Sequence, residues 1–155
     1  MQILFLTLVV ISNLFPHPET LQEQSTTTTI CEPITTAKTT YQYPSNHFQP
    51  FLVAEEYYTQ LDKSIFENYD NATFILQKKI LFKEVTETQK NFNVKTNLTH
   101  EIMDLSNHTM IHPNRQVYFL ASFTQNAQEE FHKFIVIDAE TNNILLADSI
   151  YTPIR

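Results

Sequence analysis

The stretch from residue 131 to residue 151, FHKFIVIDAETNNILLADSIY, limits the fold of this chain more than any other. Two apolar runs flank the polar residues AETNN, and each run has the length of one β-strand. The turn contains no glycine, but Asn143 can adopt a positive φ angle with little penalty. We therefore predict a closing β-hairpin that turns near Thr141.

The segment QVYFLASFTQ, residues 116–125, predicts another strand of the same sheet. Its apolar run from Val117 to Ala121 is nearly continuous, whereas a strand with one wet face alternates apolar and polar residues. Both faces of this strand should therefore be covered, one of them by helices. Two interpretations of the other cover stay open: a fully buried central strand, or an outer sheet face covered by a partner.

A first helix is predicted within residues 48–62, where apolar residues such as Tyr57 and Leu61 recur at helical spacing. Asn46, with the glutamine three residues later, resembles a capping pair at its start. A short second helix is predicted around residues 64–69. This part of the chain therefore opens the domain with helices.

The middle of the chain adds three further elements. We predict a strand in NATFILQ (71–77), a helix in KKILFKEVTETQKN (78–91) and a weak strand in THEIMDLS (99–106). The predicted order is α-α-β-α-β-β-β-β, with the helices early and the strands late. This order predicts an α+β fold in which N-terminal helices pack on one face of a bent antiparallel β-sheet.

Composition divides the chain near residue 45. Residues 3–11 are apolar except for Thr7, which is the length of a signal-peptide core and too short to span a bilayer. We assign residues 1–12 to a signal peptide, the alternative being a buried N-terminal strand or helix. Residues 13–45 form a Thr/Pro-rich disordered stretch, bare or O-glycosylated, and residues 46–155 form the folded domain.

Three N-glycosylation sequons begin at Asn71, Asn97 and Asn107. Together with the signal peptide they predict a secreted, extracellular glycoprotein, with the cytoplasm or nucleus as the alternative location. Cys31 is the only cysteine, so no internal disulfide can form. It is either a free thiol or half of an intermolecular bridge.

The charge of the chain argues against anionic partners. It has 10 basic and 17 acidic residues, a net charge of −7, and no run of cations longer than Lys78 and Lys79. We therefore expect no nucleic-acid partner and no anionic membrane surface, and the mature chain has no predicted membrane span. His108 and His112 have a spacing that could bind zinc on a helix, but Pro113 places them in a loop. We predict no metal site.

Three segments resemble the nuclear transport factor 2-like family, over about residues 48–152. YYTQL lies in the predicted first helix, where the family often has paired aromatic residues, and YDNATFILQ resembles the entry to its first strand. FHKFIVIDAETNNILLADSIY resembles its closing hairpin. The resemblance implies a cone-shaped fold of the cystatin-like superfamily with a sheet face that commonly dimerises. Residues 124–128 lack the acids with which the nuclear import factor meets the GTPase Ran.

The same resemblance implies a pocket between helix and sheet, which some relatives use for isomerase or dehydratase chemistry. Such chemistry needs a buried acid or histidine facing an aromatic donor. The candidate pocket residues are Tyr57, Tyr58 and Asp148, with Asp62 and His132 as further candidates. The alternative for each is a structural role. Cystatins share the helix-on-sheet plan, but their inhibitory loops use Gly and Trp, which this chain lacks.

We expect a binding or scaffold module without catalytic activity and without a cofactor. The sequence contains no nucleophile elbow, phosphate-cradling glycine loop or metal-ligand cluster. Its partner is expected to be a second copy or another protein, bound through the sheet face, with Tyr118 and Phe134 as the candidate association residues. The alternatives are an intracellular adaptor for nucleocytoplasmic transport, and a small-molecule-binding protein or enzyme that uses the cone pocket.

Overall fold

The computed structural model describes residues 40–154. Within this part, four antiparallel strands form one sheet in the order β1-β2-β3-β4. The strands are β1 (Phe74–Leu81), β2 (Gln116–Gln125), β3 (Glu129–Asp138) and β4 (Ile144–Pro153). The helices are α1 (Ala54–Gln60) and α2 (Val85–Lys95), with a 3₁₀ turn, η1 (Phe82–Glu84), directly before α2. The predicted α+β class with an antiparallel sheet is confirmed.

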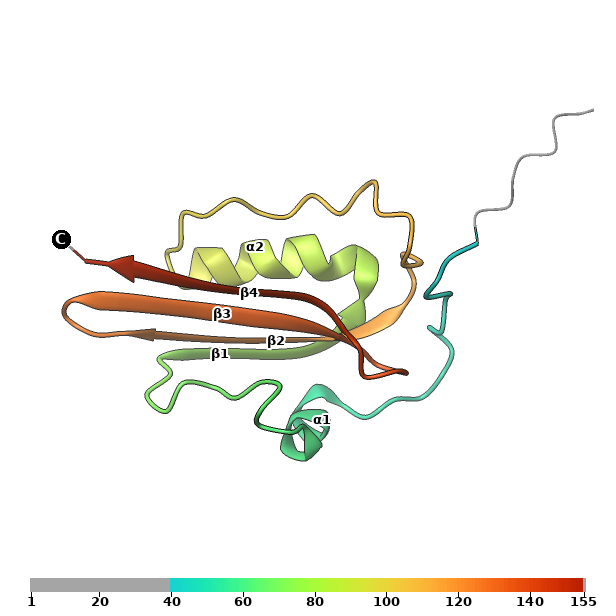
Figure 1. The fold of residues 1–155 in the computed structure, drawn as a ribbon, viewed down its shortest axis with the longest axis horizontal. Coiled ribbons are helices and arrows are strands. Elements are labelled where there is room, and N and C mark those ends of the chain that lie inside the picture. Colours follow the sequence, from blue (N-terminus) through green and yellow to red (C-terminus); the bar gives the residue numbers. More distant parts are fainter. Residues whose placement is uncertain (1–39, 155) are drawn as a thin grey trace, which may run out of the picture. The chain divides into compact units, whose positions relative to one another are not determined.

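The two helices cover opposite faces of the sheet (Figure 1). Val117 and Phe119 of β2 belong to the core beneath α2, whereas Tyr118 and Leu120 belong to the core beneath α1. The prediction that the helices share one face is therefore wrong. Successive residues of a strand point to opposite faces, so the unbroken apolar run of β2 requires an apolar cover on each side.

The interpretation of β2 as a fully buried central strand is confirmed. It pairs with β1 on one side and β3 on the other. Val117 to Ala121 are at most 1% exposed. The chain itself therefore supplies the second cover of this strand, through α1.

The closing hairpin turns between β3 and β4, as predicted. Asp138 organises the turn, because its Oδ1 accepts hydrogen bonds from the N–H groups of Glu140 (3.1 Å) and Thr141 (2.8 Å). The Thr141 hydroxyl donates to the same oxygen over 2.9 Å. The residue with a positive φ is Asn142, at 58°, rather than Asn143. Asparagine thus takes the position that glycine usually occupies.

The helix predicted over residues 78–91 begins later, at Val85. Residues 78–81 instead continue β1 and pair with β2 from Phe119 to Gln116. The chain turns at Leu81, whose N–H donates to Glu84 Oε2 over 2.8 Å. Helical spacing in this segment was misleading because its apolar residues also fit the pairing of an edge strand beside an apolar neighbour.

α2 ends in a Schellman motif. The Leu98 N–H donates to Asn93 O over 2.9 Å, and Asn97 between them has a φ of 54°. Asn97 is exposed and is also the second predicted glycosylation site. In this chain without glycine, asparagine therefore supplies the left-handed residue at the helix end.

Three other local predictions differ from the structure. Asn46 does not cap α1, which begins at Ala54; it is buried, and its Oδ1 accepts a hydrogen bond from the Gln116 N–H over 2.7 Å. Residues 64–69 form a turn and an irregular segment. Residues 99–106 form a loop instead of a strand. The loop lies against α2, since the Thr86 hydroxyl donates to Met103 O over 3.1 Å.

The predicted signal peptide, Cys31 and most of the Thr/Pro-rich stretch lie outside the described residues. Contacts of the folded domain begin before residue 46. Tyr43 forms an isolated parallel bridge with Ile111, and its N–H donates to Met110 O over 3.0 Å. No helix between residues 40 and 154 combines the length and the apolar character that crossing a membrane requires.

Candidate functional site

A groove lies beside α1, on the face of the sheet that α1 covers. We call it the α1 groove. Its volume is about 530 Å³, which is within the range of ligand-binding clefts. The segment before α1, the end of α1 with the turn that follows, β2 and the β3–β4 turn supply its walls. Its lining residues are Pro50, Phe51, Leu52, Tyr57, Gln60, Leu61, Asp62, Ile65, Tyr118, Ala139 and Asn142.

Two stacked tyrosines line the α1 groove. The rings of Tyr57 and Tyr118 are nearly parallel, with an interplanar angle of 7° and centroids 3.7 Å apart. The Tyr57 hydroxyl donates to Asn142 Oδ1 over 3.2 Å, and the Tyr118 hydroxyl donates to Leu52 O over 3.0 Å. Both phenolic protons are therefore already used to hold the walls of the groove together.

The phenols remain protonated through the physiological range. Burial, followed by the charges of Tyr118 and Asp138, raises the pKa of Tyr57 to about 12. Burial also raises the pKa of Tyr118. A phenol in this state donates a hydrogen bond but cannot act as a general base near neutral pH.

The wall formed by residues 50–52 is fixed to the sheet. Lys79 of β1 reaches across, and its Nζ donates to Phe51 O over 2.7 Å. Together with the hydrogen bond from Tyr118 to Leu52, this contact holds two successive carbonyl groups of an otherwise irregular segment. A groove with fixed walls loses little conformational entropy on binding.

One acidic residue lines the groove, and two more lie on the helix beside it. Asp62 lines the groove, and Glu55 and Glu56 lie exposed in the first turn of α1. Asp62 Oδ1 accepts a hydrogen bond from the Ser64 N–H over 2.9 Å. Hydrogen bonds from the backbone and side chain of Ser64 lower the pKa of Asp62. Asp62 is thus a fixed anion at neutral pH and not a proton donor.

The rim is apolar as well as acidic. Leu52 and Ile65, which line the groove, are each 41% exposed, and Val53 is 51% exposed. Neighbouring exposed apolar side chains around a concave surface are typical of an interaction site. The arrangement is therefore suited to holding an apolar group next to negative charge.

The structure brings Tyr57 and Asp62 to this groove but not the other predicted pocket residues. The Tyr58 hydroxyl accepts a hydrogen bond from the Asn68 N–H over 3.1 Å, and Lys63 Nζ lies 3.8 Å from the centre of its ring. Asp148 lies on the α2 face, since it pairs with Phe134 of the α2-side core. There it lines a separate hollow with Gln89 and residues 100–104.

The predicted association residues, Tyr118 and Phe134, do not form an exposed surface. Tyr118 is 1% exposed beneath α1, and Phe134 is 5% exposed in the core beneath α2. They therefore lie on opposite faces, and neither is available to a partner. The reason is the second helix: we expected helices on one face only, which would have left the other face open.

His132 is buried in the α2-side half of the molecule and not in the groove. It is 2% exposed, and neither ring nitrogen makes a well-formed hydrogen bond. Its ring lies 4.4 Å from that of Phe123 and 6.1 Å from that of Phe92, centroid to centroid. Burial lowers its pKa, against smaller opposing effects of the Thr96 backbone and Glu130.

The sequon asparagines Asn71, Asn97 and Asn107 are all exposed. The histidines with zinc-like spacing are used in turns: His108 Nδ1 accepts from the Ile111 N–H over 3.4 Å, and His112 Nδ1 accepts from the Asn114 N–H over 3.0 Å. Residues 40–154 contain no group of three or more metal-ligating side chains placed to hold an ion.

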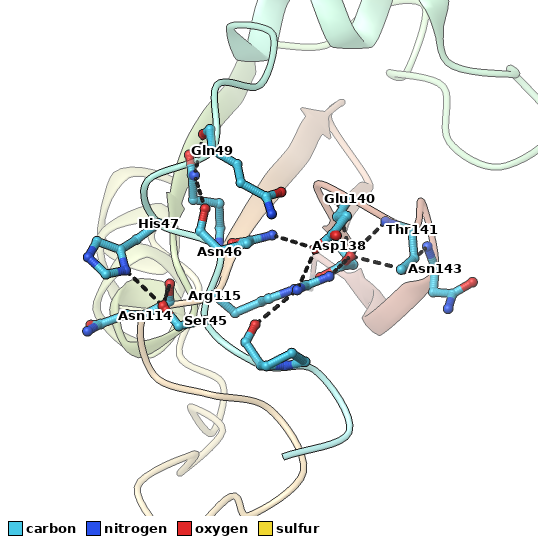
Figure 2. A network of polar contacts seen from close by, with 12 residues as sticks. Ser45, Asn46, His47, Gln49, Asn114, Arg115, Asp138, Glu140, Thr141 and Asn143 are labelled. Carbon is cyan, nitrogen blue, oxygen red and sulfur yellow. Dashed lines mark hydrogen bonds and ion pairs between the residues drawn. The ribbon is translucent and has the colours of Figure 1, made fainter. Parts of the chain in front are cut away.

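Sequence reasoning missed a buried ion pair at one end of the groove (Figure 2). Arg115, just before β2, binds Asp138 at the end of β3 through Nε (2.6 Å) and Nη2 (2.8 Å). Its Nη1 contacts Glu140 Oε2 (2.6 Å) and Pro44 O (2.9 Å). Burial raises the pKa of the Asp138 carboxyl. The hydrogen bonds from Arg115 and Thr141 outweigh this effect and hold the pKa below its usual range.

A second layer of hydrogen bonds joins this pair to the segment before α1. Gln116 Nε2 donates to the carbonyl groups of Asn46 and Gln49, each over 2.8 Å. The network therefore anchors both the start of the groove wall and the turn that carries Asn142. A signal for it exists in the sequence, because Arg115 and Asp138 bound the two most apolar strands, but only the antiparallel register brings their ends together.

Comparisons with models of known families, with curated proteins and with solved structures found no match to this chain.

Proposed function

We propose that this protein is a secreted, glycosylated binding module without catalytic activity, and that its α1 groove receives an apolar group of a protein partner. The observation that carries the proposal is the groove itself. It is concave, largely apolar and bordered by exposed Leu52 and Ile65, and its tyrosine hydroxyls already donate to the protein. Apolar burial, rather than proton transfer, is the chemistry that such a surface offers.

The charge around the groove narrows the class of partner. Asp62 lines the apolar hollow, Glu55 and Glu56 are acidic residues in the first turn of the adjoining α1, and the whole chain carries a net charge of −7. Complementary charge favours encounter and excludes partners of like charge. The occupant that fits is a peptide segment with apolar side chains flanked by basic ones.

Catalysis in the groove has less support. An acid or imidazole with a pKa moved towards neutrality is the usual requirement for acid–base work. The pKa of Asp62 is lowered and that of Tyr57 is raised, so both shifts lead away from neutrality. Asp148, the acid expected to face the tyrosines, lies on the other side of the sheet.

The extracellular location and the nuclear transport factor 2-like fold are parts of the same proposal. The apolar run at residues 3–11 and three exposed sequon asparagines support secretion. The antiparallel sheet, with a helix within the predicted residues 48–62, is compatible with the family. The runner-up is an intracellular adaptor for nucleocytoplasmic transport, which shares the fold but not the compartment.

Expression of the full chain in secretory cells separates the two. We expect protein in the medium, with a shortened N-terminus and a mobility that increases on endoglycosidase treatment. A variant with Thr73→Ala, Thr99→Ala and Thr109→Ala is the control, because it removes all three sequons and should show no increase. A cytosolic, unglycosylated product of full length would contradict the proposal.

A further inference from the structure

A second hollow, of about 540 Å³, lies beside the first sequon asparagine. It is formed by the turn before β1, by the end of β2 with the loop that follows, and by the start of β3. Tyr69, Asn71, Thr124, Asn126 and Phe131 are among its lining residues. A group attached to the Asn71 side chain therefore starts at the rim of this hollow.

The backbone holds Asn71 in this position. The Ala72 N–H donates to Tyr69 O over 3.0 Å, which closes a turn around the asparagine. The Thr124 hydroxyl donates to Asn71 O over 2.8 Å, and the Thr73 N–H donates to Phe123 O over 2.8 Å. Asn71 and Thr73 are nevertheless both exposed, so the sequon is accessible and rigidly placed.

The hollow has one aromatic side and one polar side. Tyr69 and Phe131 are both partly exposed, with ring centroids 6.1 Å apart and an interplanar angle of 54°. Lys133 Nζ lies over one face of the Tyr69 ring, 4.0 Å from its centre. The polar side is formed by residues 124–126, which carry hydroxyl and amide groups.

A pyranose ring is matched to such a surface. Its C–H groups form an apolar face that packs against the electron-rich face of an aromatic ring. Its hydroxyl and acetamido groups, at the edge, bind hydroxyl and amide side chains. Tyr69 precedes Asn71 by two residues, whereas Lys95 and Leu105 hold that position before Asn97 and Asn107.

We propose that the first N-acetylglucosamine of a glycan on Asn71 packs into this hollow against the Tyr69 ring and stabilises the turn that leads into β1. The inference depends on the proposed secretion, since the sugar is added only in the secretory pathway. It assigns the Asn71 glycan a structural role that the glycans on Asn97 and Asn107 do not share.

Two chains from secretory cells, each with a single sequon, test this role. One keeps only Asn71 (Thr99→Ala with Thr109→Ala), and the other keeps only Asn97 (Thr73→Ala with Thr109→Ala). Each is trimmed by endoglycosidase to one N-acetylglucosamine, verified by mass spectrometry, and compared with an unglycosylated form. That form is Asn71→Gln for the first chain and Thr99→Ala for the second, because Thr99→Ala removes the sequon and keeps Asn97 at its positive φ. We expect one sugar on Asn71 to raise Tm by about 4 °C, and one sugar on Asn97 to change it by less than about 1 °C.

The aromatic contact is tested in the chain that keeps Asn71. Tyr69→Leu should abolish the gain in Tm, whereas Tyr69→Phe, which keeps the ring, should retain it. NMR of the trimmed wild-type form provides a readout that does not depend on the variants: ring protons of the sugar should be shifted upfield by the ring current of Tyr69.

Three results would overturn the inference. They are an equal Tm with and without the sugar, a gain that survives Tyr69→Leu, and sugar protons at the shifts of a freely mobile glycan. Each of them leaves the proposed secretion intact, because the sugar is present. Secreted protein with no glycan on any sequon, or no secreted protein, would contradict the proposed function as well.

Discussion

His132 is a titratable residue buried among aromatic side chains. Its imidazole is packed between the rings of Phe92 and Phe123, without a well-formed hydrogen bond. Burial lowers its pKa, and the charged residue that acts on it in the opposite sense is Glu130. An imidazolium at this position would be a buried charge without adequate compensation.

Acid should therefore destabilise the fold through His132. The unfolded chain takes up this proton near pH 6.5, and the folded chain only at lower pH. The unfolded state then binds more protons, so the free energy of unfolding falls as the pH decreases from about 6.5 through the lowered folded-state pKa. We expect His132→Leu to flatten this part of the profile, measured by urea denaturation at a series of pH values.

Exposed His100 is the matched control for this experiment. His100→Leu should leave the wild-type pH profile unchanged in shape. A profile for His132→Leu that falls as steeply as that of the wild type would show that other groups carry the acid sensitivity.

Arg115 and Asp138 form a buried ion pair that should contribute strongly to the free energy of unfolding. Their side chains are 3% and 0% exposed, respectively. Breaking a buried pair by removing one partner leaves an uncompensated charge and costs about 3–5 kcal/mol. We expect Arg115→Met to lower the free energy of unfolding by that amount, measured by urea denaturation at neutral pH.

Glu140 provides the comparison, because it contacts the same guanidinium from a position that is 42% exposed. Glu140→Gln should cost less than about 1 kcal/mol. If the two substitutions cost the same, the buried Arg115–Asp138 contact does not anchor the end of the groove.

At the level of elements, the sheet is held more firmly than α1. α1 has seven residues and no side-chain hydrogen bond at its N-cap, and a helix of this length is not stable by itself. It depends on Ala54, Tyr57 and Leu61, which pack on the sheet. β2, in contrast, is bonded on both edges and covered on both faces.

Hydrogen exchange should therefore distinguish α1 from β2. We expect the amides of α1 to exchange at least about tenfold faster than those of β2, because α1 can open without unfolding of the sheet. Leu61→Ala should widen the difference by accelerating α1 while leaving β2 unchanged at neutral pH. Equal acceleration of both elements would mean that α1 and the sheet open as one unit.

The elements also differ in how far the sequence predicts them. The closing hairpin and β2 have strong local patterns, and both are found where expected. The predicted helix starts too early, at residue 78 instead of Val85, because residues 78–81 fit a helix as well as a strand. Pairing with β2 makes these residues part of β1. Residues 99–106 lacked a strong pattern, and contacts with α2 hold them as a loop.

The candidate site likewise depends on contacts between elements that local sequence patterns do not specify. Helical spacing and aromatic pairing identified Tyr57, and its contact with Tyr118 follows once α1 covers that face. Alternation along a strand places Asp148 on the same face as Leu146, but only the fold decides which helix covers that face. The Arg115–Asp138 pair depends on register between strands, which single-residue patterns do not specify.

For the molecule as a whole, the covering of both sheet faces changes where a partner can bind. The buried centre of the sheet offers no open surface at Tyr118 or Phe134. The exposed apolar residues near α1, including Leu52, Val53 and Ile65, provide an alternative surface. The central claim is therefore that the α1 groove binds an apolar peptide segment with flanking positive charge.

NMR chemical-shift mapping with two blocked peptides tests this claim most directly. The full mature chain is titrated with RLFRL and with its acidic counterpart ELFEL, and Ile65→Asn, which removes apolar surface without changing the charge, serves as the groove variant. We predict that RLFRL shifts the amides of residues 50–65, Tyr118 and residues 139–142, that ELFEL binds at least about tenfold more weakly, and that Ile65→Asn weakens the binding of RLFRL. Shifts that are absent, that cluster around residues 100–110, or that show unchanged affinity in Ile65→Asn would contradict the claim.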